Sequence, residues 1–336
     1  MKNKLFNRGL LLLLGLGFIS CGPSKDDGKP PVKEIVVKEK IVPADRPAFN
    51  SDTAYSITAK QVAFGPRVPN SAAHKACSAY LINELKRFGA EVIEQRTKVT
   101  AYTGESLDIV NIIGRINPQA TRRIMLCAHW DTRPQADQDA LFPKARFDGA
   151  VDGAASAGIL LEIARAMATK PSAIGVDIVL FDAEDYGNPS QGNTYCLGSQ
   201  YFALNPFRPD FKPVYGILLD MVAAPGATFY REGYSMQYAP AVVTRVWDIA
   251  AELGHGAYFR NELSGPITDD HYFINTLMGV PTIDIIHHDP NSKTGFGEYW
   301  HTRDDNMEKV DKTTLQVVGE TLIGVIYSEK AEAPNL

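Results

Sequence analysis

The sequence predicts an α/β protein in which helices cover both faces of a largely parallel sheet. Two observations carry this prediction: short, uniformly apolar segments, and amphipathic segments that alternate with them along the chain. A strand that is apolar on both sides needs a cover on both sides, and helices between consecutive parallel strands provide it. The composition, with 45% hydrophobic and 22% charged residues, is that of a globular protein.

The first half of the domain opens with a helix and two β patterns. The helix is predicted over Ala72 to Phe88, where Ser71 is placed as the N-cap and Gly89 as the stop signal. Segments 91–101 and 107–116 follow it and have β patterns.

The remaining elements alternate between buried strands and helices. Apolar runs predict strands over 124–128, 176–181, 215–220 and 281–286, the first of them ending in His129. Helical patterns lie over Gly158–Met167, Ala239–Leu253, His271–Leu277 and Thr313–Tyr327. In such folds, the chemistry lies just beyond the carboxyl ends of the strands.

The N-terminus has the layout of an export signal. Basic residues precede an apolar run over 9–19, which is shorter than the about 20 residues of a membrane span. The run ends in Ser20 and Cys21, which resembles a bacterial lipoprotein signal with Cys21 as the lipidated residue. The alternative is an ordinary secretory signal with an incidental cysteine. Either signal exports the protein, and the lipoprotein interpretation places it in the periplasm or cell envelope, anchored to a membrane.

Composition also divides the chain into three parts. We expect residues 1–20 to be the signal peptide, residues 21–50 a polar tether rich in Lys, Asp and Pro, and residues 51–336 a single α/β domain. The chain has 34 Lys and Arg against 39 Asp and Glu, a net charge of −5, so it offers no broad basic surface for nucleic acid. We expect no nucleic-acid partner, no membrane contact beyond the lipid anchor, and a monomer.

Acidic residues gather where the apolar strands end. His129 and Asp131 follow one strand, residues 182–185 follow the next, and Asp220 ends a third. Asp148 and Asp152 precede the helix at Gly158, and His301 lies in a late loop. Carboxylates at three strand ends repel one another unless a cation neutralises them, and zinc accepts imidazole and carboxylate ligands together. The alternative is that each acid merely caps a helix or faces solvent.

The adjacent Glu184 and Asp185 are the sharpest element of this pattern. Neighbouring residues at a strand end can take separate roles, one binding a metal while the other moves a proton.

These residues follow the order seen in the zinc-dependent exopeptidase superfamily, and within it the chain resembles the glutaminyl cyclases (glutaminyl-peptide cyclotransferases). The resemblance spans roughly Ser51 to the C-terminal helix. The segments that carry it are 219–225, 267–271 and 300–306, the last reading Trp-His-Thr-Arg-Asp-Asp-Asn. It implies a three-layer α/β sandwich with a mostly parallel mixed central sheet. It also implies an acyltransferase that converts N-terminal glutamine of peptides and proteins to pyroglutamate and releases ammonia.

The resemblance also assigns roles to individual residues. It implies one zinc ion per chain, with Asp152, Asp185 and His301 as its ligands, and Glu184 as the general acid/base. Asp220 and Asp269 match further catalytic carboxylates that hydrogen-bond near the substrate amine and the base, and Ile267 and Trp300 match pocket walls.

The chain departs from the cyclases at two places. The cyclases usually have Glu where this chain has Asp185, so the metal must sit closer to that strand. Animal cyclases also carry a Trp shortly after the acidic pair, whereas this chain has residues 186–190, Tyr-Gly-Asn-Pro-Ser, there. Another residue must therefore rebuild one wall of the pocket.

Two other functions remain open from the sequence. A zinc aminopeptidase would use a second metal site, which His129 and Asp220 complete around a bridging Asp152. A non-catalytic peptide-binding lipoprotein would keep the fold without the reaction, although it would have no need of a free carboxylate at Glu184.

Overall fold

The computed structural model describes residues 40–331. The predicted signal peptide, the lipidation site Cys21 and the tether up to residue 39 lie outside the described residues. Among the helices of the described part, none is both long and apolar enough to cross a membrane.

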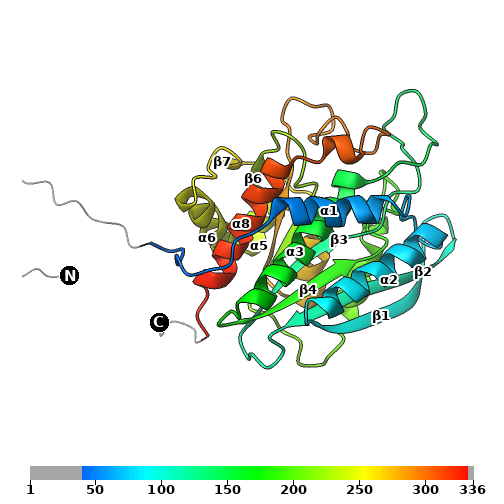
Figure 1. The fold of residues 1–336 in the computed structure, drawn as a ribbon. Coiled ribbons are helices and arrows are strands. Elements are labelled where there is room, and N and C mark those ends of the chain that lie inside the picture. Colours follow the sequence, from blue (N-terminus) through cyan, green and yellow to red (C-terminus); the bar gives the residue numbers. More distant parts are fainter. Residues whose placement is uncertain (1–39, 332–336) are drawn as a thin grey trace, which may run out of the picture. The chain divides into compact units, whose positions relative to one another are not determined.

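A six-stranded mixed sheet is the centre of the described part (Figure 1). Its strand order is β1-β2-β4-β3-β5-β8, and the pairs β3/β4, β3/β5 and β5/β8 are parallel, whereas β1/β2 and β2/β4 are antiparallel. The strands are β1 (Glu91–Thr100), β2 (Ser106–Ile116), β3 (Arg123–His129), β4 (Gly175–Phe181), β5 (Gly216–Asp220) and β8 (Thr282–Ile286), with β6 (Phe229–Arg231) and β7 (Phe259–Leu263) forming a separate pair. The predicted α/β architecture is confirmed.

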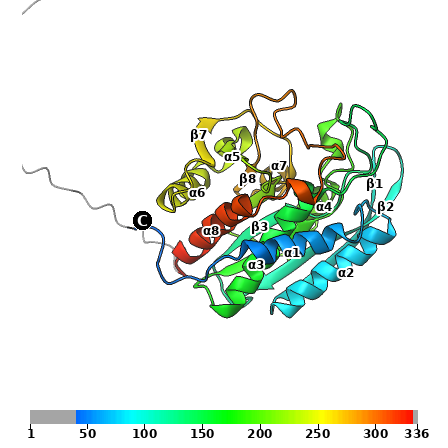
Figure 2. The same cartoon turned by 45° about the horizontal axis from the view of Figure 1, so that its top comes forward.

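Helices follow the strands along the chain and pack on both faces. They are α1 (Ser51–Val62), α2 (Ala72–Arg87), α3 (Ser156–Thr169), α4 (Leu197–Leu204), α5 (Gly233–Tyr238), α6 (Pro240–Glu252), α7 (Asp270–Phe273) and α8 (Lys312–Ser328). Short π-helical turns, η1 (Ala150–Ala155) and η3 (Ile274–Met278), precede α3 and follow α7, and 3-10 turns lie at η2 (Gly192–Thr194) and η4 (Met307–Lys309). Figure 2 shows α1, α2, α3 and α8 side by side over one face of the sheet.

The period-two alternation of the strands divides the apolar residues between two cores. In β3, Leu126 faces the larger core, which α1, α2, α3, α6 and α8 cover, whereas Met125 and Cys127 face a smaller one. Phe202 of α4 and Ile274 of η3 fill that second core. Both faces of the central strands are therefore covered by apolar side chains.

The packed part of the chain begins before Ser51. Val42 and Phe49 are buried, and the carboxylate of Glu252 accepts the backbone N–H groups of Ile41 and Val42 at 2.8 and 3.0 Å. The ring of Phe49 lies so close to α8 that a Cβ at Gly319 would be 2.3 Å from it. The last residues of the predicted tether thus belong to the core of the domain.

This contact leads to a stability prediction. Phe49→Ala is expected to lower the free energy of unfolding by about 3 kcal/mol, because it removes a buried ring and leaves a cavity against α8. Urea denaturation of the purified domain measures the change. Leu204→Ala is the matched control, since that side chain is 65% exposed and its loss should change stability by no more than about 0.5 kcal/mol. Equal effects of the two substitutions would contradict the packing described.

One predicted helix differs from the structure. The segment 271–277 is not one α-helix, because α7 ends at Phe273 and a π-helical turn follows it. The side chain of Asn275 causes the change: it donates to the carbonyls of His271 and Thr282 and accepts from the Thr282 N–H. These bonds tie the turn to the start of β8, and an amphipathic pattern does not report them.

Candidate functional site

The predicted site residues meet at the carboxyl edge of the parallel strands. His129 ends β3, Asp220 ends β5, and Glu184 and Asp185 follow β4. Because these three strands are neighbours and parallel, their carboxyl ends lie at the same edge of the sheet. Asp152 reaches this edge from the turn before α3.

Asp152, Asp185 and His301 form a group that fits a divalent cation. One ligand atom from each lies within 4.8 Å of the others, and all three side chains are buried. Nε2 of His301 lies 3.1 Å from Oδ1 of Asp185 and 3.5 Å from Oδ2 of Asp152. Oδ2 of Asp185 is buried and has no hydrogen-bond partner among residues 40–331, so this carboxylate keeps an acceptor free for a cation. Two carboxylates and an imidazole are donors that zinc accepts.

The charged side chains of this group act strongly on one another. Burial raises the pKa of Asp185, as does the neighbouring Asp152, although His301 opposes the shift. Burial disfavours the imidazolium of His301, but Asp185, Asp137 and Asp152 outweigh it and raise its pKa to about 9.

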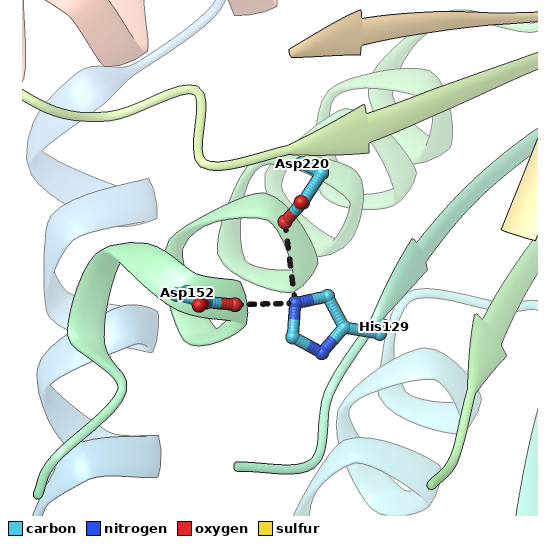
Figure 3. A group of neighbouring side chains, drawn as sticks. All are labelled: His129, Asp152 and Asp220. Carbon is cyan, nitrogen blue, oxygen red and sulfur yellow. Dashed lines mark ion pairs between the residues drawn. The ribbon is translucent and has the colours of Figure 1, made fainter. Parts of the chain in front are cut away.

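A second group shares Asp152 with the first (Figure 3). Nε2 of His129 lies 2.9 Å from Oδ1 of Asp152 and 3.2 Å from Oδ1 of Asp220, so one ring nitrogen faces both carboxylates. A side chain on Gly153 would place its Cβ 2.3 Å from this nitrogen, so only glycine fits beneath the ring. The structure therefore brings together the residues of both metal sites considered from the sequence.

Glu184 is held beside the first group by contacts to its backbone and its carboxylate. The carboxylate of Asp131 accepts the backbone N–H of Glu184 at 3.0 Å and that of Asp185 at 3.3 Å. Sγ of Cys196 donates to Oε1 of Glu184 at 3.3 Å. Burial, and then the charge of Asp185, raise the pKa of Glu184 well above its usual range. A carboxyl group whose pKa is raised in this way is a candidate general acid/base.

Backbone strain is concentrated at this edge. Six non-glycine residues of the described part have positive φ, and two of them are asparagines, which tolerate it. The other four are Ala183 (φ 50), Cys196 (φ 57), Met221 (φ 52) and His301 (φ 54). His301 is a candidate metal ligand, Ala183 and Met221 adjoin Glu184 and Asp220 in the sequence, and Cys196 donates to Glu184. Strained residues are typical of functional sites, where the surrounding structure maintains them.

Further side chains orient the metal-group residues. Asp305 accepts the N–H groups of Val151 and Asp152 at 2.7 and 3.2 Å, which fixes the turn that carries Asp152. Oδ1 of Asp137 lies 3.2 Å from Nδ1 of His301, and Arg133 binds both the Asp137 carboxylate and the Asp185 carbonyl. Asp305 lies in a segment that carries the sequence resemblance. Asp137, Arg133 and Cys196 were not predicted as site residues, because a single sequence carries no signal for them.

Aromatic and acidic residues of the late loops complete the site. The ring of Trp300 stacks on that of His301 with 3.9 Å between the centroids. Asp269 is buried and lies within 4.8 Å of Glu184 and Cys196, and Ile267 is two residues away on the same loop. Burial raises the pKa of the Asp220 carboxyl group to about 7.

Two acidic residues considered from the sequence serve the fold instead. Asp182 is paired with Nε2 of His74 at 2.8 Å and accepts the backbone N–H of Val110 at 2.7 Å. Asp148 contributes its backbone carbonyl, which accepts a hydrogen bond from the buried Arg67. Position after a buried strand therefore did not by itself distinguish site residues from structural ones.

Residues 111–326 match the family described as Peptidase family M28. The chain belongs to this family. It is 26% identical to the glutaminyl-peptide cyclotransferase of Bos taurus over 288 residues, which covers 76% of each chain. A crystal structure of Tannerella forsythia glutaminyl cyclase is 52% identical, covers 84% of this chain and 100% of that one, and has a TM-score of 0.83. A Zn-dependent exopeptidase from Parabacteroides distasonis is 50% identical, with coverage of 84% and 99% and the same TM-score of 0.83.

Membership of the M28 family agrees with the position of the site. The matched residues include the turn at Asp152, the acidic pair after β4 and the loop of His301. The family match therefore covers the whole candidate metal group.

Proposed function

We propose that this M28 protein is a zinc-dependent glutaminyl-peptide cyclotransferase, which converts the N-terminal glutamine of peptides and proteins to pyroglutamate and releases ammonia. The observation that carries the proposal is the ring of Trp300 stacked on the metal-group residue His301, in a chain 52% identical to a glutaminyl cyclase. The general acid/base, Glu184, is part of the same arrangement.

The proposed zinc site consists of Asp152, Asp185 and His301, with one ion per chain. In support, these side chains converge within 4.8 Å, and Asp185 has an acceptor oxygen without a donor in the described part of the chain. When bound to these three side chains, a zinc ion would supply Lewis-acid polarisation of the substrate amide carbonyl. Asp137 holds His301 from the other ring nitrogen, and Asp305 holds the turn of Asp152, so the ligands are oriented before substrate binds.

The residues of this chain then bring the reacting atoms together. Trp300 and Ile267 hold the glutamine side chain so that the α-amine approaches its own amide carbon, an intramolecular arrangement that lowers the barrier by several kcal/mol. Glu184 takes a proton from the α-amine as the new C–N bond forms, and gives it to the amide nitrogen as the old C–N bond breaks and ammonia leaves. Asp220 and Asp269 hydrogen-bond near the amine and the base.

Tyr195 is our candidate for the wall that a Trp forms in animal cyclases. The guanidinium carbon of Arg133 lies over the Tyr195 ring, 5.4 Å from its centroid. The ring also packs against Gly187, two residues after the acidic pair. Burial raises the pKa of the Tyr195 phenol, and the nearby charges of Asp185 and Glu184 raise it too. The ring therefore adjoins the site.

The aminopeptidase alternative depends on a second metal between His129, Asp152 and Asp220. The structure brings these three side chains together as closely as the ligands of the proposed zinc site, so the number of bound zinc ions distinguishes the two functions. The non-catalytic alternative does not explain why Glu184 is held by both Asp131 and Cys196.

Mass spectrometry of a peptide that begins with glutamine tests the function. We expect the zinc-loaded protein to remove one ammonia from this peptide and to release no free amino acid. The same peptide with an acetylated N-terminus is the matched control, because its α-nitrogen is no longer a nucleophile. Release of free glutamine would support the two-zinc aminopeptidase, and no reaction would support a peptide-binding protein.

From the N-terminal sequence alone, we further propose an exported lipoprotein that is anchored through Cys21 in the cell envelope and acts as a monomer. Support comes from the basic, apolar and Ser-Cys-Gly order of residues 1–22. Membrane fractionation of a Cys21→Ala variant tests the anchor, and sedimentation of the domain tests the monomer.

A further inference from the structure

A line of buried ionisable side chains extends from Glu184 into the interior. Asp269 lies within 4.8 Å of Glu184, and Asp269, His271 and Asp284 lie within the same distance of one another. Nδ1 of His271 is 3.8 Å from Oδ2 of Asp284, and its Nε2 is 3.0 Å from Oε2 of Glu232. These residues come from α7, β8 and the N-cap of α5, and no step of the proposed reaction uses the three beyond Asp269.

The inner end of this line is fully hydrogen-bonded. The carboxylate of Glu232 accepts from the backbone N–H groups of Tyr234, Ser235 and Ile267, and from the Ser235 hydroxyl, at 2.6–2.8 Å. Although burial opposes its charge, His271 and Ser235 lower the pKa of Glu232 to about 2. Glu232 is therefore ionised, and its bond to Ile267 links the line to the predicted substrate pocket.

The side chains in the middle of the line have unused hydrogen-bonding atoms. Both carboxyl oxygens of Asp284, Oδ2 of Asp269 and Nδ1 of His271 have no hydrogen-bond partner among residues 40–331. Asp284 and His271 are fully buried and Asp269 is 4% exposed, so solvent does not satisfy these atoms. One carboxyl oxygen of Asp269 lies within 4.8 Å of one of Asp284, so acceptor atoms lie beside acceptor atoms. Such an arrangement is costly unless a proton or a cation lies between them.

We propose that Asp284 shares one proton with Asp269, and so acts as a positioning residue that directs the Asp269 carboxyl group toward Glu184. The proposal rests on the proposed cyclase function. A single shared proton gives both carboxyl groups a hydrogen bond and removes one of two adjacent buried charges. It also keeps Asp269 from accepting the proton that Glu184 must carry to the leaving ammonia.

The surroundings of Asp284 favour a proton over a metal ion. Burial and the charges of Asp269, Asp220 and Glu232 raise its pKa well above its usual range, and only His271 faces it with a possible positive charge. A metal ion would have Asp269, His271 and Asp284 as its ligands from the described residues, and because His271 and Asp284 are fully buried, solvent would not supply the fourth ligand that zinc takes.

The test compares a substitution that keeps a hydrogen-bond donor at position 284 with one that removes it. Asp284→Asn replaces the shared proton by an amide donor, and we expect kcat/KM to stay within about threefold of the original value. Asp284→Leu keeps the branching at Cγ but is bulkier and has no donor, and we expect a loss on the order of tenfold or more, with the zinc content unchanged. Asp248→Asn on the exposed side of α6 is the control for loss of a negative charge. Thermal melting of each variant checks that it is folded.

Infrared spectroscopy keeps the test informative if the leucine variant does not fold. The difference spectrum of the original protein minus Asp284→Asn should contain the C=O stretch of a protonated carboxylic acid. Equal activity of the asparagine and leucine variants, or absence of that band, would overturn the proposal. A loss of metal together with activity in Asp284→Asn would also overturn it, and would place a cation in the cluster. If the original chain does not cyclise glutamine, the proposed function fails first, and the infrared band still reports on the proton.

Discussion

Glu184→Gln is expected to lower kcat at least about 100-fold, because the amide cannot accept the proton of the α-amine. Gln has the same shape as Glu, and its carbonyl oxygen can still accept from Cys196, so the geometry of the site should persist. Glu184 is also not among the proposed zinc ligands. The variant should therefore bind zinc and substrate normally while turnover stops.

Ammonia release and metal analysis of the same preparation measure these two expectations. Glu262→Gln is the matched control, since this carboxylate lies on the exposed strand β7 and should leave both kcat and zinc content unchanged. Turnover of Glu184→Gln at the original rate would exclude Glu184 as the general acid/base. Loss of zinc would instead make it a metal ligand.

His301→Ala is expected to abolish cyclisation by removing a zinc ligand. Changes to groups that merely orient ligands cost about 10–100-fold in metal affinity, so loss of the ligand itself should cost more. The purified variant should contain almost no zinc, because two carboxylates alone remain at the site. Trp300 would also lose the ring on which it stacks.

His129→Gln is the comparison that distinguishes one zinc from two. His129 contacts Asp152 and Asp220 but is not a ligand of the proposed site, so this variant should keep one zinc per chain. Elemental analysis after extensive dialysis gives both stoichiometries. Two zinc ions in the original protein that fall to one in His129→Gln would favour the aminopeptidase arrangement.

Much of the fold follows from local sequence patterns. The apolar run that ends at His129 could only be a buried strand, and α2 has both its cap at Ser71 and its stop at Gly89 in the sequence. The helices α1 and α4 were not predicted, because their apolar residues pack on neighbours rather than forming a clear local stripe. Phe49 likewise lies in a polar stretch, and its burial depends on the glycine that α8 places opposite it.

The site was predictable in part, for a topological reason. Parallel strands bring their carboxyl ends to one edge, so acids that follow different strands meet there, as Glu184, Asp185 and Asp220 do. The same rule also selected Asp182, which instead pairs with His74. Asp182 and Glu184 are only two residues apart, but Ala183 between them has a positive φ of 50, so strand alternation no longer predicts which side chain reaches the site.

The sequence by itself determined the α/β class, the edge of the sheet where chemistry occurs, and the candidate ligands Asp152, Asp185 and His301. Only the tertiary structure decided how these groups are held: Asp131 beneath the acidic pair, Cys196 against Glu184, Asp137 behind His301, and Asp284 behind Asp269. The physical reason is that strand and helix periods are local, whereas each of these contacts joins segments that are distant in sequence or folded back by strained turns.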